Sequence, residues 1–372
     1  MRKILRMGVA LLMLVSLPGC TDRIDLEDAT LALMIGLDLS EKKDLLFYVS
    51  SPVFSREAQA KSEEYGVRAH SLRESRQRFD ELVSGVTLSG KVQLFVLGRR
   101  LLDTPDWFQL MDVVYRDARF SVNARMLVYD GPLEELFQMQ SKTKPRVALH
   151  LMKLVDTANR RNITVKTTVQ ELHRQMYEKG ITPTITKLDK ATTTVQVEGT
   201  ALLTETGAFA TVISGRETSF LQMLLQGKRG EISISLPYPD STEKEKIVKK
   251  RVSFFVKGLS KKVKTSFVDG RFQFDVDLKL RTSISERLFP FDMDKDYKKM
   301  EAMLEKEFHR EYQELFQKCQ KLKIDPFGFG LLARAYQYEA WKKVQNEWPQ
   351  AFSQAKISIT PHVDIKGNGN IR

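Results

Sequence analysis

An alternating run of apolar and polar residues in the C-terminal half limits the fold most strongly. After the pair Asp269-Gly270, apolar side chains occupy every second position at Phe272, Phe274, Val276, Leu278 and Leu280, and the positions between them are polar or charged. Side chains of a strand point alternately to its two faces, so this run predicts a half-buried strand. The Asp-Gly pair is typical of a tight hairpin turn, which makes that strand antiparallel to the one before it.

The segments around this hairpin predict the layer that covers its apolar face. Two long helices are expected at about 294–322 and 327–347, and the alternation over 356–365 predicts a last strand in the same sheet. Cys319 falls on the apolar stripe of the first helix, where a buried small side chain is expected. Basic strands are expected at about 247–257 and 260–268, and their lysines are interpreted as solvated strand faces, with a membrane-facing role as the alternative. The C-terminal half is therefore predicted to be a sheet packed on long helices.

The first half has a mixed α/β pattern. A hairpin is expected from 30–39 and 45–54, an amphipathic helix at 71–86, and strands at 92–97 and 120–129. Helices are expected at 107–115, 132–140, 146–160 and 166–179. After a Thr-rich run at 191–195, a strand pair is expected at 199–203 and 208–214, followed by a helix at 216–226.

The length is too great for one compact core, so more than one domain is expected. We predict an α+β, multi-domain fold with mixed and antiparallel sheets packed against helices. The predicted divisions are 1–19, a signal peptide; 20–190, an N-terminal α/β region of one or two subdomains; 191–367, a C-terminal α+β domain; and 368–372, a tail.

The first twenty residues predict export and lipidation. The basic residues Arg2, Lys3 and Arg6 precede an apolar run from Met7 to Leu17, which is shorter than the roughly twenty residues that span a bilayer. Leu17-Pro18-Gly19-Cys20 follows and resembles the cleavage site of a lipoprotein signal peptide. We therefore expect Cys20 to become a diacylglycerol-modified, N-palmitoylated N-terminus. The alternative is an ordinary secreted protein in which this cysteine has no special role.

Charge and residue spacing exclude several classes of function. The formal net charge of +12 falls to +9 when Arg2, Lys3 and Arg6 are removed, which fits an anionic surface outside the cytoplasm better than nucleic acid. The histidines never stand at metal-ligand spacing, and Gly328-Phe329-Gly330 lacks the third glycine of a dinucleotide site. No GxSxG elbow is present. We predict no catalytic site, no metal and no cofactor.

Several short segments resemble the Ger(x)C family of spore germination lipoproteins. Asp22 to Asp28 followed by Ile35-Gly36-Leu37-Asp38 is similar to the family's opening, although Thr21 replaces its tryptophan. Ser89-Gly90-Lys91, Leu97-Gly98 and Arg116-Asp117-Ala118-Arg119 resemble its central segments. Gly199 to Leu202, Thr204 to Gly207, Asp325-Pro326-Phe327-Gly328-Phe329-Gly330, Trp341 and Trp348 resemble its C-terminal signature.

The resemblance implies the C subunit of a nutrient germinant receptor. Such a subunit is expected on the outer face of the spore inner membrane, held by its lipid beside polytopic A and B subunits, with a non-enzymatic scaffold or coupling role. Arg116, Asp117 and Arg119 are candidate partner contacts, or else hold a loop by salt bridges. For Asp325-Pro326 we expect a helix-capping role, and for Trp341 and Trp348 a place in the core on one helical face.

Two other classes remain open at this point. A lipid-anchored solute-binding protein of a transporter would need two doubly wound lobes. A wall-directed lipoprotein enzyme would show a pocket with titratable residues of shifted pKa.

Overall fold

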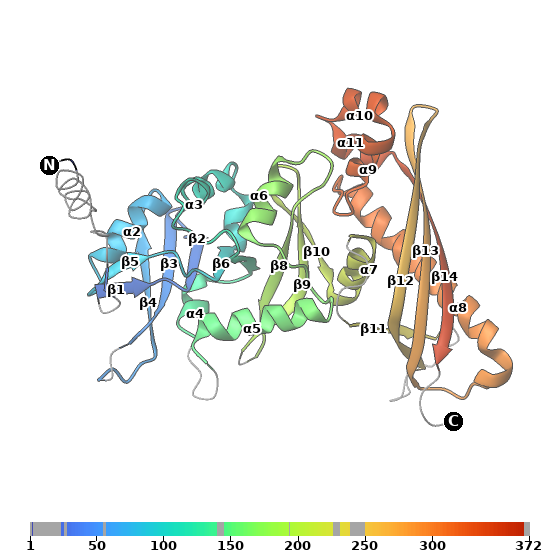
Figure 1. Ribbon diagram of the computed structural model, residues 1–372, viewed down its shortest axis with the longest axis horizontal. Helices are drawn as coiled ribbons and strands as arrows, with labels where there is room; N and C mark the ends of the chain where they lie inside the picture. The colour runs from blue at the N-terminus through green and yellow to red at the C-terminus, as the bar shows by residue number, and fades with distance from the viewer. Residues whose placement is uncertain are drawn as a thin grey trace.

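The computed structural model describes residues 2, 24–25, 28–54, 57–139, 145–192, 194–225, 231–238 and 250–367. Figure 1 shows two sheets side by side along the long axis, each with its own helices. The predicted α+β class with mixed sheets on helices is confirmed. Apart from Arg2, the predicted signal peptide lies outside the described residues, as do Cys20 and the tail 368–372.

The N-terminal sheet has eight strands in the order β10-β9-β8-β7-β6-β2-β3-β4. Its central strands β2, β6, β7 and β8 are parallel, and the outer pairs are antiparallel. The strands are β2 (Met34–Leu39), β3 (Leu45–Pro52), β4 (Ser62–Arg68), β6 (Leu94–Gly98), β7 (Arg125–Tyr129), β8 (Thr184–Lys190), β9 (Val195–Leu203) and β10 (Phe209–Ser214). A separate parallel pair joins β1 (Ala29–Leu31) to β5 (Val86–Leu88).

Helices cover both faces of this sheet, and each face has its own core. One face packs against α2 (Leu72–Asp80), η2 (Arg99–Asp103), η3 (Trp107–Met111), α3 (Asp112–Arg116) and α6 (Val169–Tyr177). The other packs against α4 (Leu133–Phe137) and α5 (Val147–Arg160). The predicted hairpin of β2 and β3 is confirmed. The helix expected at 71–86 ends earlier, at Asp80; turns and bends follow at 81–85, and residues 86–88 form β5.

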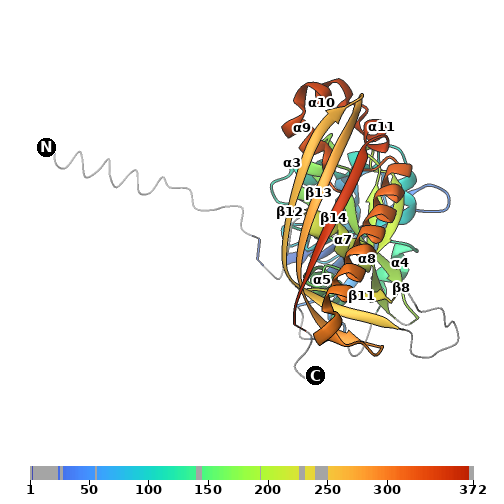
Figure 2. The same cartoon turned by 90° about the vertical axis from the view of Figure 1, so that its right-hand side faces the viewer.

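The C-terminal sheet has the order β11-β12-β13-β14. Its strands are β11 (Ile232–Pro237), β12 (Arg251–Val268), β13 (Arg271–Arg287) and β14 (Lys356–Gly367). Val268 pairs with Arg271 across the Asp269-Gly270 turn, and β14 lies parallel to β13, so the predicted hairpin and last strand are confirmed. The long helix α8 (Met293–Lys321) crosses the apolar face of the sheet, as Figure 2 shows, and Cys319 is buried there.

Two expectations for this half are wrong. The second long helix is divided into α9 (Phe329–Tyr336), α10 (Tyr338–Val344) and α11 (Trp348–Ser353). Gln337 leaves helical geometry (φ −137°, ψ 49°), and α11 begins anew with Pro349 in its first turn, where proline is tolerated. The two basic strands are one strand, β12, with a register shift between Val256 and Gly258.

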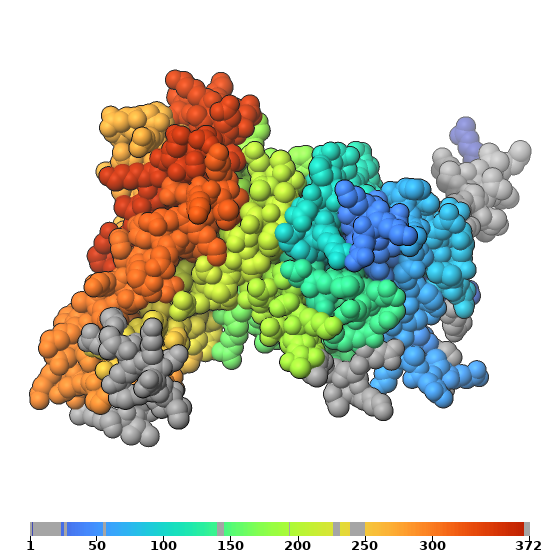
Figure 3. Space-filling view, turned by 180° about the vertical axis from the view of Figure 1, so that it is seen from behind, coloured from blue at the N-terminus to red at the C-terminus, as the bar shows by residue number. Residues whose placement is uncertain are grey.

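Helix α7 (Gly215–Leu225) connects the two halves. Its apolar residues Phe220, Leu221 and Leu224 belong to the same core as α8 and the C-terminal sheet. The Tyr312 hydroxyl of α8 donates to the Phe220 carbonyl at 3.2 Å, and the Lys318 ammonium donates to the Val212 carbonyl of β10 at 3.0 Å. In Figure 3 the yellow-green residues around this helix lie between the two halves.

The predicted boundary near residue 190 stays a prediction. β9 and β10 follow that residue, yet they hydrogen-bond to β8 and complete the N-terminal sheet. Among the residues that the structure describes, no helix is both long and apolar enough to cross a membrane.

Candidate functional site

The segment Asp325 to Gly330 forms the joint between the two halves. It connects α8 to α9 and lies against the loop 178–183, which links α6 to β8. A Cβ atom on Gly330 would lie 2.6 Å from the Gly180 Cα and 2.7 Å from the Trp348 ring. Only glycine lets the two backbones come this close. The joint is also tied by a hydrogen bond of 2.9 Å from the Thr182 N–H to the Asp325 carbonyl.

An ion pair extends the joint at its edge. The guanidinium of Arg334 on α9 donates to both carboxylate oxygens of Glu178, at 2.8 and 3.0 Å. The two residues are 156 positions apart in the sequence, so this bidentate pair links the N-terminal and C-terminal halves directly.

Asp325 organises the joint from inside. Its side chain is fully buried, and Oδ2 accepts hydrogen bonds from the Gly330 N–H at 2.9 Å and the Trp348 Nε1–H at 3.0 Å. Oδ1 accepts from the Phe327 N–H at 3.2 Å. Burial raises the pKa of Asp325 to about 6, and these hydrogen bonds oppose that shift by favouring the charged form.

The capping role of this segment differs in detail from the expectation. The residue at the N-cap position of α9 is Gly328, in the left-handed region at φ +74°, and Asp325 lies three residues earlier. Its carboxylate still pairs with the Gly330 N–H of the first turn, an N–H that has no partner within the helix. Pro326 follows Asp325 in the connecting loop.

Trp341 and Trp348 are both buried, but they belong to different helices rather than to one helical face. Trp348 packs edge-on against Phe272 of β13, with ring centroids 5.3 Å apart. Trp341 lies under the Arg334 guanidinium, 5.5 Å from its ring centroid. Both tryptophans therefore pack α9 to α11 against neighbouring structure.

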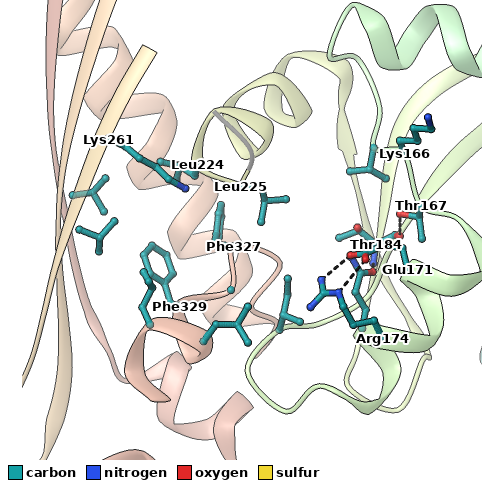
Figure 4. A pocket seen from close by; sticks show the side chains of 18 residues that line it. Lys166, Thr167, Glu171, Arg174, Thr184, Leu224, Leu225, Lys261, Phe327 and Phe329 are labelled. Atoms are coloured by element: carbon teal, nitrogen blue, oxygen red, sulfur yellow. Dashed lines mark hydrogen bonds and ion pairs between the residues drawn. The ribbon is translucent and has the colours of Figure 1, made fainter. Parts of the chain in front are cut away.

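A cavity of about 570 Å³ opens beside this joint, between the two halves (Figure 4). One wall comes from α6 and its flanking segments, and the opposite wall comes from α7, β12, β13 and the joint itself. The lining residues are Val165, Lys166, Thr167, Glu171, Arg174, Gln175, Ile181, Thr184, Leu224, Leu225, Lys261, Val263, Val276, Phe327, Gly328, Phe329, Leu331 and Leu332. No single segment of the sequence contains this pattern, and sequence analysis did not predict the cavity.

The polar groups on the α6 wall of the cavity are hydrogen-bonded to one another. Arg174 donates to both carboxylate oxygens of Glu171 at 2.7 and 2.9 Å, and the Gln175 amide donates to the same carboxylate at 2.9 Å. Gln175 also accepts from the Thr184 N–H at 3.0 Å, and the Thr167 hydroxyl donates to the Thr184 carbonyl at 2.6 Å. Groups held in this way can orient a ligand. Within the described ranges, no cluster of His, Cys, Asp and Glu could hold a metal ion.

Two family profiles match the two halves of this chain. The one described as "Spore germination protein N-terminal domain" matches residues 22–190. The one described as "Spore germination B3/ GerAC like, C-terminal" matches residues 198–369. The chain belongs to the GerAC-like family of spore germination proteins. This confirms the resemblance found in the sequence.

A solved structure titled "Crystal Structure of the GerBC protein" has the same fold. Its TM-score is 0.56 at 15% sequence identity, and the alignment covers 92% of this chain and 100% of that chain. At this identity the likeness shows the fold alone. No curated protein matches the sequence.

Asp38, Gly98 and Gly207, which belong to other segments that carry the resemblance to the GerAC-like family, make packing contacts in the N-terminal half. Asp38 is buried against Gly98, where a Cβ would collide with its carboxylate, and it accepts from the Leu133 N–H at the start of α4 at 3.1 Å. Gly207, at φ +84°, offers its carbonyl to the Trp107 Nε1–H at 2.9 Å. At both glycines, therefore, a side chain from a distant segment lies close against the backbone.

The charged patch Arg116, Asp117 and Arg119 has a buried centre and an exposed rim. Asp117 is 9% exposed and accepts from Arg119 at 2.9 Å and from Arg73 of α2 at 3.3 Å. The bonded Arg119 guanidinium holds the pKa of Asp117 well below its usual range. The Arg116 side chain is 79% exposed and, within the described residues, pairs only with Asp112 of its own helix, at 2.8 Å. Asp117 thus fastens the loop, while the two arginines lie on the surface.

Proposed function

We propose that this chain is the lipid-anchored C subunit of a nutrient germinant receptor of bacterial spores. In this role it assembles with polytopic A and B subunits on the outer face of the spore inner membrane, as a non-enzymatic scaffold or coupling subunit. The observation that supports this most strongly is the family match, which extends over both halves of the chain. The family is generally non-catalytic, in line with the proposed role.

The proposed anchor is Cys20. The N-terminal sequence supports it, because a basic start and an apolar run too short to span a bilayer precede the cysteine. The start of β1 at Ala29 lies nine positions after Cys20, and a chain reaches at most about 3.5 Å per residue. A lipid on Cys20 would therefore keep the start of β1 within roughly 30 Å of the membrane surface. Tethering of this kind raises the effective concentration of the body for membrane partners.

The fold gives no support to the solute-binding alternative. That class requires two doubly wound lobes. The described C-terminal half is instead a sheet built on the antiparallel β12-β13 hairpin, with its inner face on one long helix.

The anchor can be tested by comparing the wild-type chain with Cys20→Ala in spore membrane fractions. We expect the wild-type chain to sediment with membranes and to yield an N-terminal peptide with the mass of an acylated cysteine. Cys20→Ala should lose both properties. Equal membrane retention of the two chains, or an unmodified Cys20 in the wild type, would refute lipid anchoring.

The patch at Arg116 is the proposed contact with a partner. Arg116→Glu reverses an exposed charge whose partner in the described structure is Asp112 alone, so the fold should tolerate it. Lys299→Glu is the matched control, because Lys299 is also exposed on a helix and pairs with an acid three residues earlier. Recovery of polytopic partners should fall for Arg116→Glu and not for Lys299→Glu. Equal recovery of partners by the two variants would show that the contact does not involve Arg116.

A further inference from the structure

We propose that the cavity between the two halves binds a small molecule with an apolar body and one carboxylate, and that Lys261 holds the carboxylate. This inference does not depend on the proposed receptor role, because it concerns a site within one chain.

Lys261 stands on the apolar inner face of the C-terminal sheet. Its partner across the strand pair is Leu278, which is buried, and its neighbours on the same face of β12 are Leu259 and Val263. Both of these pack against the C-terminal core. A charged residue here breaks the apolar alternation of this face, and because Lys261 is itself exposed, a ligand in the cavity could reach it. Residues that break a local pattern in this way are expected at functional sites.

The lysine reaches this face because of a bulge. Before the register shift between Val256 and Gly258, the buried residues of β12 are even-numbered, as at Val252 and Phe254. After it, the core-packed residues are odd-numbered, as at Leu259 and Val263. One extra residue in a strand turns every later side chain to the opposite face. Lys261 therefore faces the cavity, and Lys262 faces away from it.

The Lys261 ammonium has no hydrogen-bond or ion-pair partner within the described structure. Desolvation by the cavity walls lowers the pKa of Lys261, and no neighbouring acid offsets this effect. Among the described residues of the lining, Glu171 is the one carboxylate, and it is already bound by Arg174 and Gln175. Figure 4 shows Lys261 on one wall and the Glu171–Arg174 pair on the opposite wall. Because Arg174 offsets the charge of Glu171, Lys261 leaves the described part of the cavity with a net positive charge, which favours an anionic ligand.

The remaining walls fit an apolar body. Leu224 and Leu225 of α7, Val263 of β12, and Phe327 and Phe329 of the joint surround the space next to Lys261. The volume of about 570 Å³ lies within the range of small-molecule sites, which are mostly apolar with a few polar groups that fix orientation. Since both halves supply walls, a bound molecule would contact both and stabilise the joint.

The test is isothermal titration calorimetry on the full chain in phosphatidylcholine nanodiscs, with empty nanodiscs subtracted. The probes are 3-phenylpropionate, its neutral amide and 3-phenylpropylammonium, which share one apolar body and differ in charge. We expect saturable binding with one site per chain, tightest for the carboxylate. Lys261→Met keeps the length of the side chain and removes its charge, so it should weaken carboxylate binding tenfold or more and leave amide binding unchanged.

Two further variants make the result specific. Lys262→Met removes a charge from the opposite face of the same strand and should bind like the wild type, and Lys261→Arg should retain the preference for the carboxylate. The proposal is overturned if no probe binds saturably, if the amide binds as tightly as the carboxylate, or if Lys261→Met and Lys262→Met have equal affinities.

Discussion

Replacing Asp325 with asparagine should remove a specific pH dependence from the stability of the fold. Burial raises the pKa of the Asp325 carboxyl from 3.8 to about 6 in the folded chain. Between these values the folded chain binds more protons than the unfolded chain, so the free energy of unfolding falls as pH rises through this window. The difference between these two pKa values corresponds to about 3 kcal/mol of stability, fully present below pH 3.8 and lost above pH 6.

The assay is urea unfolding from pH 4 to pH 7, followed by tryptophan fluorescence, since the Trp348 indole donates to Asp325. Relative to Asp325→Asn, the wild-type chain should lose about 2 kcal/mol of stability across this interval, because part of the full effect lies below pH 4. Asp269→Asn at the exposed hairpin turn should keep the wild-type pH dependence. Parallel curves for wild type and Asp325→Asn, or a wild type that gains stability as pH rises, would refute the reasoning.

Three further predictions concern packing. Gly330→Ala should destabilise the chain by about 2 kcal/mol or more in urea unfolding, because its Cβ would lie 2.6 Å from Gly180. A Cβ at Gly270 would meet no atom within 4 Å, so Gly270→Ala should cost only about 1 kcal/mol, for its positive φ. If Gly330→Ala and Gly270→Ala cost the same free energy of unfolding, the steric argument is wrong. Trp107→Phe should cost about 1–3 kcal/mol by leaving the buried Gly207 carbonyl without its donor, and a wild-type unfolding midpoint would contradict this. Burial raises the pKa of the Cys319 thiol, so iodoacetamide should label it only as the chain unfolds, and rapid labelling of the folded chain would disprove its burial.

The elements that sequence predicted well are those whose pattern is local. The alternation from Phe272 to Leu280 and the Asp269-Gly270 turn require no knowledge of distant residues, and they gave the β12-β13 hairpin correctly. The same holds for the apolar stripe of α8, in which Met300, Leu304, Phe308 and Cys319 are all buried. Tyr297, at the start of that stripe, is 43% exposed because it lies in the first turns of the helix, before the covered region.

What sequence could not predict depends on contacts between distant segments. Strand β8 went unpredicted, because its burial depends on β7 and β9 on either side and on the cores that cover both faces of the sheet. The cavity needs walls from α6, α7, β12 and the joint, which are far apart in the sequence. Lys261 is exposed, as expected for a solvated strand face, but its position on the inner face of the sheet follows from a bulge, which leaves no mark on residue composition. The signal that could have indicated it is the change from even to odd apolar positions between Phe254 and Leu259.

The most direct test of the receptor role is to purify the intact wild-type chain from detergent extracts of spore inner membranes and identify what comes with it. The account predicts two polytopic membrane proteins in a constant ratio to this chain, and loss of both when spores carry Cys20→Ala. Purification of the chain alone, or together with a transporter permease, would contradict the assignment to a germinant receptor.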